Sequence, residues 1–437
     1  MAMLAACTPK TAGVQQYGDF RDWAATPPMG WNSWDCYGAA VTEAQVRANA
    51  EYMAEHLKPC GWEYVVVDIQ WYQPTADSHE YAPFSEERMD GFGRFFPAEN
   101  RFPSAAGGAG FKPLADFVHS LGLKFGIHIM RGMPRMAAHR RLPILGSAYS
   151  CDQVANPNSI CAWNPDMYGL RQDHPGAKAY YDSIFKLYAQ WGVDFVKCDD
   201  IAREYPHCKR EIELISEACR GCGRDIVLSL SPGPAPLEQA EHLKRYANMW
   251  RITDDFWDDW RLLLAMFERA EKWCVHAGPG HWPDADMLPV GALRQCCENH
   301  PAGGWTNFTQ AEQRTMMTLW CMLRSPLMIG GDLPKNDAFT LDLLTNARVL
   351  GIERDSWCAH PLCASGDECA WIAPKKDGSG CYVAAFNLSN RARRVIVDPA
   401  CLERDFTAAT ELWTGKPARR LAARLAPHDA AVWEVQF

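Results

Sequence analysis

Short apolar or aromatic runs alternate with longer amphipathic stretches along most of the chain, starting near Thr26. Runs of this length bounded by turn residues are typical of buried strands, and the longer stretches have the periodicity of helices. Eight strands are predicted, at Met29–Trp34, Tyr64–Trp71, Lys124–Met130, Asp194–Asp199, Ile226–Ser231, Met249–Asp254, Trp282–Leu288 and Leu327–Gly331. Eight strand–helix units without a Gly-rich phosphate turn favour a closed (β/α)8 TIM barrel over an open doubly wound sheet.

The pattern changes after about Arg348, where short strands punctuated by turn residues replace the strand–helix units. These strands are expected at Cys369–Ala373, Cys381–Asn387, Arg394–Val397, Thr410–Leu412 and Ala430–Gln436. They predict a small C-terminal antiparallel β-sandwich. The expected organisation is therefore a leader or linker over 1–25, a catalytic barrel over 26–348 and the sandwich over 349–437. A long polar loop is expected over 132–173, at the functional end of the barrel.

The amino-acid composition indicates which kinds of ligand the protein is suited to bind. The chain is 48% hydrophobic with a net charge of -9, which favours a large folded core and disfavours nucleic acid. No apolar run is long enough to span a membrane. The 18 Trp are suited to binding the apolar faces of sugars. The 18 Cys are scattered, with a lone C-x-x-C at Cys219 and Cys222, so we expect neither a metal site nor a cofactor.

The first residues, MAMLAACTPK, resemble the end of a bacterial lipoprotein signal in which Cys7 receives the lipid. The basic start and most of the apolar segment of such a signal are missing. We expect an exported bacterial protein, periplasmic or lipid-anchored, with a cytoplasmic location as the alternative.

Charged and polar residues gather at the carboxyl ends of the predicted strands. They are Asp68, His128, Lys197, Asp199, Asp200, Arg251, Asp254, Asp255, Asp284 and Asp286. Charges at a barrel mouth are costly unless they are paired or functional. Acidic strand ends together with many aromatic residues, and without a metal or nucleotide motif, indicate glycoside hydrolysis, which needs two carboxyl groups.

Asp199 and Asp255 are the candidate catalytic pair, because their strands face each other across the barrel mouth. Lys197 shares strand parity with Asp199 and would keep it ionised, as a nucleophile requires. Arg251 would position Asp255, which we expect to be the acid/base, kept protonated by partial burial. The residues alone leave Asp254 open as an alternative to Asp255.

The chain resembles glycoside hydrolase family 27, the melibiase-type α-galactosidases, from about Thr26 to its end. The resemblance is carried by TPPMGWNSW (26–34), VDFVKCDD (193–200), WRITDDF (250–256), GPGHWPDADML (278–288) and SPLMIGGDL (325–333). It implies a (β/α)8 barrel followed by a β-sandwich, and hydrolysis with retained configuration that needs no metal. It also implies that Asp199 is the nucleophile and Asp255 the acid/base. The sugar-binding positions fall on Trp34, Asp68, Lys197, Arg251 and Asp286, and His128 occupies a slot where relatives often carry Tyr.

Two positions depart from the family pattern. Ile69 replaces a second acid that, by the resemblance, contacts the C6 hydroxyl of the sugar, so it would remove an acceptor and add bulk. Ser231 ends a strand that carries a larger acidic or aromatic group in well-known relatives, and it would leave a more open wall.

The expected activity is release of terminal α-D-galactopyranosyl residues from an oligo- or polysaccharide. A β-L-arabinopyranosidase, whose sugar has no C6, and an isomaltodextran-type α-glucan hydrolase are the alternatives. A non-catalytic carbohydrate-binding barrel is more remote, and the sequence leaves the oligomeric state open.

Overall fold

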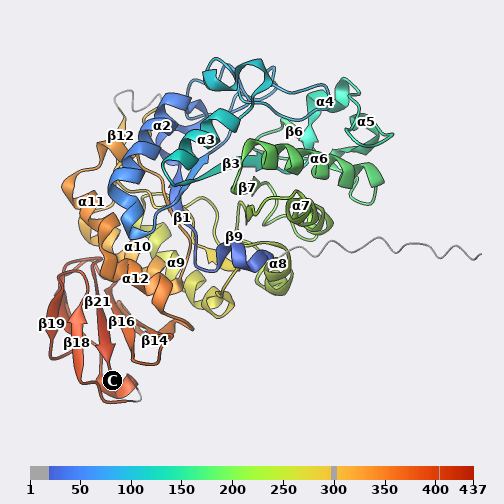
Figure 1. Cartoon of the computed structure of the whole chain (residues 1–437). Coiled ribbons are helices and arrows are strands. Elements are labelled where there is room, and N and C mark those ends of the chain that lie inside the picture. Colours follow the sequence, from blue (N-terminus) through green and yellow to red (C-terminus); the bar gives the residue numbers. More distant parts are fainter. Residues whose placement is uncertain (1–18, 297–302, 403) are drawn as a thin grey trace, which may run out of the picture.

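A computed structural model describes residues 19–296, 303–402 and 404–437 (Figure 1). Its central sheet contains eight strands in the order β10-β9-β8-β7-β3-β2-β1-β13. The bounds are β1 Met29–Asn32, β2 Tyr64–Val67, β3 Lys124–Met130, β7 Phe195–Asp199, β8 Val227–Leu230, β9 Met249–Arg251, β10 Trp282–Asp284 and β13 Leu327–Ile329. The pairs within this sheet are parallel.

The sheet closes just beyond β10. The amide of Leu288 donates to the carbonyl of Met328 at 2.7 Å, and the amide of Gly330 donates to the carbonyl of Leu288 at 2.9 Å. The predicted (β/α)8 barrel is therefore confirmed, because the chain just beyond β10 bridges in parallel to β13 at the other end of the sheet.

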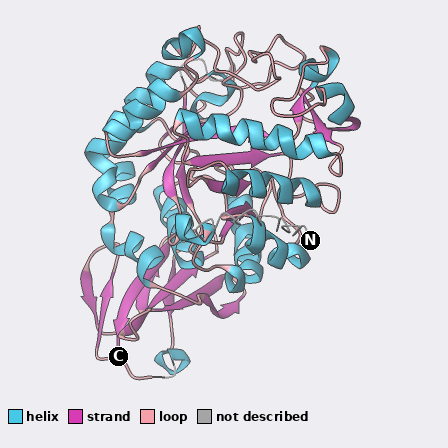
Figure 2. Ribbon diagram, turned by 45° about the vertical axis from the view of Figure 1, so that its right-hand side comes forward, coloured by secondary structure: helices cyan, strands magenta, loops and turns pink. Residues whose placement is uncertain are grey.

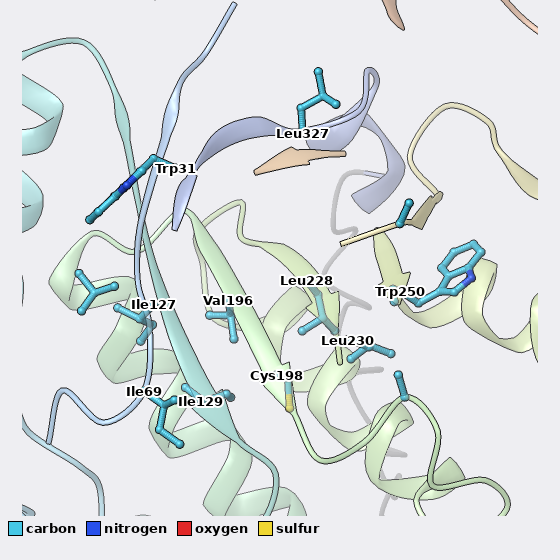
Figure 3. Packing of buried hydrophobic residues seen from close by; sticks show 14 of the residues in the cluster. Trp31, Ile69, Ile127, Ile129, Val196, Cys198, Leu228, Leu230, Trp250 and Leu327 are labelled. Atoms are coloured by element: carbon cyan, nitrogen blue, oxygen red, sulfur yellow. The ribbon is translucent and has the colours of Figure 1, made fainter. Parts of the chain in front are cut away.

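Strand alternation sorts the side chains into two layers. Val65, Ile127 and Val196 belong to the large cluster that packs against the helices (Figure 3). Their strand neighbours Val66 and Phe195 belong to a second cluster inside the barrel. Successive residues of a strand point to opposite faces, so any polar residue in phase with Val66 or Phe195 faces the barrel interior. This parity decides which strand-end residues reach the site.

The longer amphipathic stretches between consecutive barrel strands form helices. Their bounds are α2 Glu43–Tyr52, α3 Lys112–Ser120, α6 Pro175–Trp191, α7 Lys209–Gly221, α8 Ala240–Tyr246, α9 Trp260–Trp273 and α10 Gln310–Leu323. Side-chain caps define several of their starts: Thr42 and Thr309 form capping boxes, and Asp259 accepts from the amide of Arg261. The short helix α1, Trp34–Tyr37, directly follows β1 and carries part of the site.

The segment 132–173 is more regular than the polar loop expected from the sequence. It forms a three-stranded sheet in the order β4-β6-β5, from β4 Met133–Pro134, β6 Met167–Leu170 and β5 Ala155–Ile160, with the helices α4 Arg135–His139 and α5 Cys151–Val154. The strands are two to six residues long and β5 is mostly polar, so periodicity gave little signal.

The expected leader or linker extends into the folded barrel. Residues Phe20–Ala24 form a 3-10 helix. The side chain of Asn248 donates to the carbonyl of Phe20 at 3.0 Å, and the indole of Trp282 donates to that of Ala24 at 2.7 Å. Cys7 lies outside the described residues, so the expectation of an exported lipoprotein stays a prediction.

Two antiparallel sheets form the C-terminal part of the chain (Figure 2). The larger sheet contains β14 His360–Ser365, β15 Glu368–Pro374, β16 Gly380–Asn387, β18 Ala408–Glu411, β19 Lys416–Ala418 and β21 Ala430–Gln436, and the smaller contains β17 Arg393–Ile396 and β20 Ala422–Leu425. Val383, Val395 and Trp433 share one apolar cluster across the two sheets, which confirms the sandwich. The expected boundary at 348/349 falls inside helix α12, Ala347–Asp355, which follows α11, Ala338–Thr345. Within the described residues, no helix is long and apolar enough to cross a bilayer.

Candidate active site

One pocket at the carboxyl ends of the barrel strands collects most of the candidate residues. Its empty volume is about 340 Å³, part of which is open to solvent, and it is lined by Trp34, Asp68, Lys197, Asp199, Arg251, Asp255 and Asp286, with five further residues. Several of these side chains share the parity of the barrel's interior cluster: Asp68 follows Val66, and Lys197 and Asp199 follow Phe195. Strand alternation therefore aims them into the mouth.

Asp199 is a buried carboxylate with a dedicated donor. Its Oδ2 lies 3.0 Å from Nε2 of His128, and its Oδ1 accepts from the amide of Asp200 at 3.0 Å. Burial alone would raise the pKa of Asp199, but the hydrogen bond from His128 and the positive charge of Lys197 outweigh it and hold that pKa well below its usual range. The group is therefore ionised across the neutral range.

Lys197 and Asp68 form the neighbouring ion pair. Nζ of Lys197 lies 2.9 Å from Oδ2 of Asp68, which also accepts from the side-chain amide of Asn32 at 2.7 Å. Burial would lower the pKa of Lys197, yet the charges of Asp68 and Asp199 raise it overall, so the ammonium is charged. This side of the pocket presents a fixed cation between two carboxylates.

Asp255 has a different environment. Its Oδ1 accepts from Nη2 of Arg251 at 2.8 Å, as expected, but its side chain is 57% exposed. Asp255 is therefore more exposed than the sequence led us to expect. Asp254 lies outside the pocket lining and pairs with Arg203 at 2.9 Å, so the geometry favours Asp255 over Asp254.

The buried acid on this side is Asp286. Its Oδ2 lies 2.7 Å from the same Nη2 of Arg251 and accepts from the amide of Phe256 at 2.7 Å. Burial raises the pKa of Asp286 to about 7 against the opposing charge of Arg251, and the nearby carboxyl group of Asp255 adds to the rise. Arg251 thus bridges an exposed carboxylate and a buried one.

Three expected sugar-binding residues lie outside this pocket lining. His128 is fully buried, so its contact is with Asp199 rather than with a ligand. Ser231 lines an adjoining chamber of the barrel interior together with Lys197, Arg251 and Asp286. Ile69 is 1% exposed and belongs to the core cluster that also contains Ile127 and Ile129 (Figure 3). The bulk expected from Ile69 in the sugar pocket is therefore not seen.

Five lining residues were not predicted: Asp35, Tyr81, Phe256, Trp257 and Met287. Tyr81 comes from the loop after β2 and stacks on Trp34 with ring centroids 5.3 Å apart. Trp257 lies under the guanidinium of Arg294 at 5.1 Å. Asp35 and Trp257 directly follow the motifs at 26–34 and 250–256, so their place near the site could have been predicted. No motif or strand end next to Tyr81 indicates that it reaches the site. Among the described residues, no group of three or more His, Cys, Asp or Glu has metal-holding geometry.

Comparisons with known proteins place the chain in a family. A family model for α-galactosidase A matches residues 165–355. The rice (Oryza sativa subsp. japonica) α-galactosidase is 26% identical over 427 residues, covering 93% of this chain and 84% of the relative. A GH27 β-L-arabinopyranosidase from Geobacillus stearothermophilus is 52% identical with a TM-score of 0.93, and the match covers 96% of this chain and 98% of that one. The chain belongs to glycoside hydrolase family 27.

A second solved structure is similar over nearly the same length. It is a putative α-N-acetylgalactosaminidase from Bacillus halodurans, with 49% identity and a TM-score of 0.85, and the match covers 94% of this chain and 97% of that one. Two relatives of comparable sequence identity are thus named for activity on different sugars. Membership of family 27 makes the protein a glycoside hydrolase that acts on a sugar substrate, and it leaves the sugar to be argued separately.

Proposed function

We propose that the protein is a retaining, exo-acting β-L-arabinopyranosidase that releases terminal sugars from an oligo- or polysaccharide. The observation that carries the sugar assignment is the 52% identity, over nearly the whole chain, to a β-L-arabinopyranosidase. A variant of that relative has also been solved in complex with arabinose. This reverses the order expected from the sequence, in which α-D-galactosides came first.

The end of β2 supports the same sugar. Asp68 is the one carboxylate that this strand end gives to the pocket, since Ile69 packs in the core. A galactoside carries a C6 hydroxyl that needs a partner when it is buried, whereas an arabinopyranoside has no such group. The loss of an acceptor, rather than the bulk of Ile69, is therefore the physical basis for the preference.

The chemistry proposed for the pocket is double displacement. The ionised carboxylate of Asp199 attacks the anomeric carbon while the bond to the leaving oxygen breaks and Asp255 gives that oxygen its proton. In the second half Asp255 takes a proton from water, whose oxygen displaces Asp199 at the same carbon. Two inversions return the original configuration. The charge state of Asp199 and the exposure of Asp255, where a leaving group or water must enter, support these roles.

α-D-Galactoside hydrolysis is the second candidate. It is favoured by the position of Ile69, whose side chain does not line the pocket, and by the curated α-galactosidases that match along most of the chain. Both sugars share the ring and the configuration at the carbons other than C5, so the same two aspartates would serve either.

A comparison of kcat/KM on p-nitrophenyl β-L-arabinopyranoside and p-nitrophenyl α-D-galactopyranoside tests the assignment. We expect the arabinoside to be preferred by about tenfold or more, which corresponds to one missing hydrogen-bond partner in a buried site. A preference for the galactoside would contradict the proposal and select the second candidate. Hydrolysis of p-nitrophenyl α-D-glucopyranoside alone would favour the α-glucan alternative. The Asp199→Asn variant, run on the same substrates, corrects for contaminating glycosidases.

A further inference from the structure

Asp35 lies in the pocket but is used by none of the steps above. It is the second residue of α1, directly after Trp34, and both residues line the pocket. Asp35 is only 3% exposed. A carboxyl group this deeply buried at a ligand site needs a partner, because removing it from water without a hydrogen bond is costly.

The protein supplies no such partner within the described residues. Oδ2 of Asp35 is buried without a hydrogen bond. The other pocket acids differ: Asp68 is paired with Lys197, Asp199 with His128, and both Asp255 and Asp286 with Arg251. Within the described part of the chain, Asp35 is therefore the one acid of the pocket lining whose side chain has no hydrogen-bond donor or ion-pair partner.

The backbone opposite Asp35 makes room for its carboxyl group. A Cβ atom placed on Gly330, which follows β13, would lie 2.0 Å from Oδ2 of Asp35. Any other residue at Gly330 would push the carboxyl group aside. Oδ2 of Asp35 therefore packs against Gly330, and the other carboxyl oxygen is the one left to face the pocket that Asp35 lines.

The surroundings also determine the protonation state. Burial raises the pKa of Asp35 well above its usual range, and the nearby carboxyl groups of Asp286 and Asp255 add to the rise against the opposing charge of Lys197. These surroundings favour the protonated carboxylic acid, which has one O–H donor and one carbonyl acceptor. A sugar hydroxyl is likewise both donor and acceptor, so the two groups are complementary.

We propose that Asp35 is a substrate-binding acid whose other carboxyl oxygen, the one not packed against Gly330, forms a hydrogen bond with one ring hydroxyl of the sugar in the pocket. The proposal rests on the proposed glycosidase function and adds a specificity-determining residue to it. The bound sugar gives the buried carboxyl group a hydrogen bond, so Asp35 favours a sugar with a hydroxyl at that position over one without it.

Two substitutions separate this role from a packing role. Asp35→Asn keeps a neutral donor and acceptor of the same shape, so we expect kcat/KM to stay within about fivefold of the wild type. Asp35→Leu keeps the branched shape but leaves the sugar hydroxyl unpaired, so we expect kcat/KM to fall by about 10- to 100-fold. We expect the Tm of Asp35→Leu to be equal to or above that of the wild type, because an unpartnered acid is removed.

Deoxygenated substrates identify the hydroxyl. The aryl glycoside that the wild type prefers is compared with its 2-, 3- and 4-deoxy analogues, in the wild type and in Asp35→Leu. One analogue is expected to lose activity with the wild type and to lose almost nothing further with Asp35→Leu, which is the signature of a shared contact. Glu353→Gln is the matched control: Glu353 is a buried acid with two unpartnered oxygens far along the chain, on α12, and this variant should leave kcat/KM unchanged.

The proposal is overturned if Asp35→Leu keeps kcat/KM within twofold of the wild type, or if it loses Tm and activity together. It is also overturned if each deoxy analogue loses the same factor in both proteins. Failure of the glycosidase activity on which this inference rests would be seen earlier and separately, as a wild type that hydrolyses neither the arabinoside nor the galactoside; a preference for the galactoside would change only the sugar assignment.

Discussion

The two sides of the pocket handle their aspartates in opposite ways. On the side formed by β2, β3 and β7, Asp199 is buried and held by His128, next to the ammonium of Lys197. On the side formed by β9 and β10, Asp255 pairs with Arg251 but is exposed to solvent, and the buried acid is Asp286, which pairs with the same arginine. One carboxyl group is locked in a single charge state and position, and the other is left accessible.

The difference matches the two demands of double displacement. A nucleophile must be ionised and fixed before the substrate arrives, which buried donors achieve. An acid/base must gain and lose a proton within one cycle and must meet both a leaving group and water, which requires access. The contrast supports the proposed roles of Asp199 and Asp255 by environment, independently of the motif in which each residue stands.

The largest expected effect comes from Asp199→Asn. The amide cannot attack the anomeric carbon, so kcat should fall by about 10⁴-fold or more, with Tm close to that of the wild type. The measurement is kcat on an activated aryl glycoside, together with a thermal melt. Retention of more than a tenth of the wild-type rate would break the contrast between the two sides.

Asp255→Ala should depend on the leaving group. We expect about a 10²- to 10⁴-fold loss on a glycoside with a poor leaving group and a much smaller loss with dinitrophenolate, which leaves without a proton. Azide should restore turnover and give a glycosyl azide of retained configuration, since it attacks the Asp199 ester. An equal loss on all substrates would contradict the acid role.

Asp254→Asn is the matched control for this variant. Asp254 is the adjacent residue, is 65% exposed and pairs with Arg203 outside the pocket. An exposed ion pair contributes little, so the rate should stay within about twofold of the wild type.

His128→Phe tests how the buried side is held. The substitution keeps a ring but removes the donor to Asp199, so the pKa of Asp199 should rise toward its ordinary value. Since Asp199 must be ionised, the acidic limb of the kcat/KM profile should move to higher pH, with a loss of about tenfold at neutral pH. His128→Tyr, which restores a ring donor, should recover part of this loss. An unmoved acidic limb in His128→Phe would show that His128 only packs.

Asp286→Asn tests the side of the pocket formed by β9 and β10 through the pH dependence of thermal stability. The pKa of Asp286 is about 7 in the folded protein, against 3.8 for the ordinary group. A raised folded pKa means that the wild type loses stability as pH rises from about 4 through 7, and the Asn variant lacks this loss. The Tm of the variant relative to the wild type should therefore increase from pH 5 to pH 7 and then level off. A difference in Tm that is constant across this range would contradict the buried titration.

The barrel was predictable because its signals are strong and repeated. All eight predicted strands exist, and Lys124–Met130 has its predicted bounds. The others mostly end earlier than expected: Tyr64–Trp71 shortens to Tyr64–Val67, because the chain beyond Asp68 turns away to build the site. The small sheet within 132–173 and strands β14, β19 and β20 were missed, since short or polar strands carry little periodicity.

The candidate site was predictable as far as strand parity and motifs reach. Asp68, Lys197, Asp199 and Arg251 follow from alternation. The position of Ile69 in the core could have been read from the same rule, since it is in phase with Val65 and Val67. Tyr81 comes from a long loop, and its approach to Trp34 depends on tertiary folding. The exposure of Asp255 also depends on loop geometry that no periodicity encodes.

The central claim is that Asp199 forms a covalent bond to the sugar while Asp255 serves as acid and base. The most direct measurement uses Asp255→Ala with the dinitrophenyl glycoside of the sugar that the wild type prefers. The first step then needs no acid, and the second lacks its base, so the glycosyl-enzyme should accumulate. After acid quenching and proteolysis, mass spectrometry should find the sugar as an ester on the peptide that contains Asp199, at Asp199 itself. A sugar attached to any other residue, or no adduct together with a product of inverted configuration, would contradict the account.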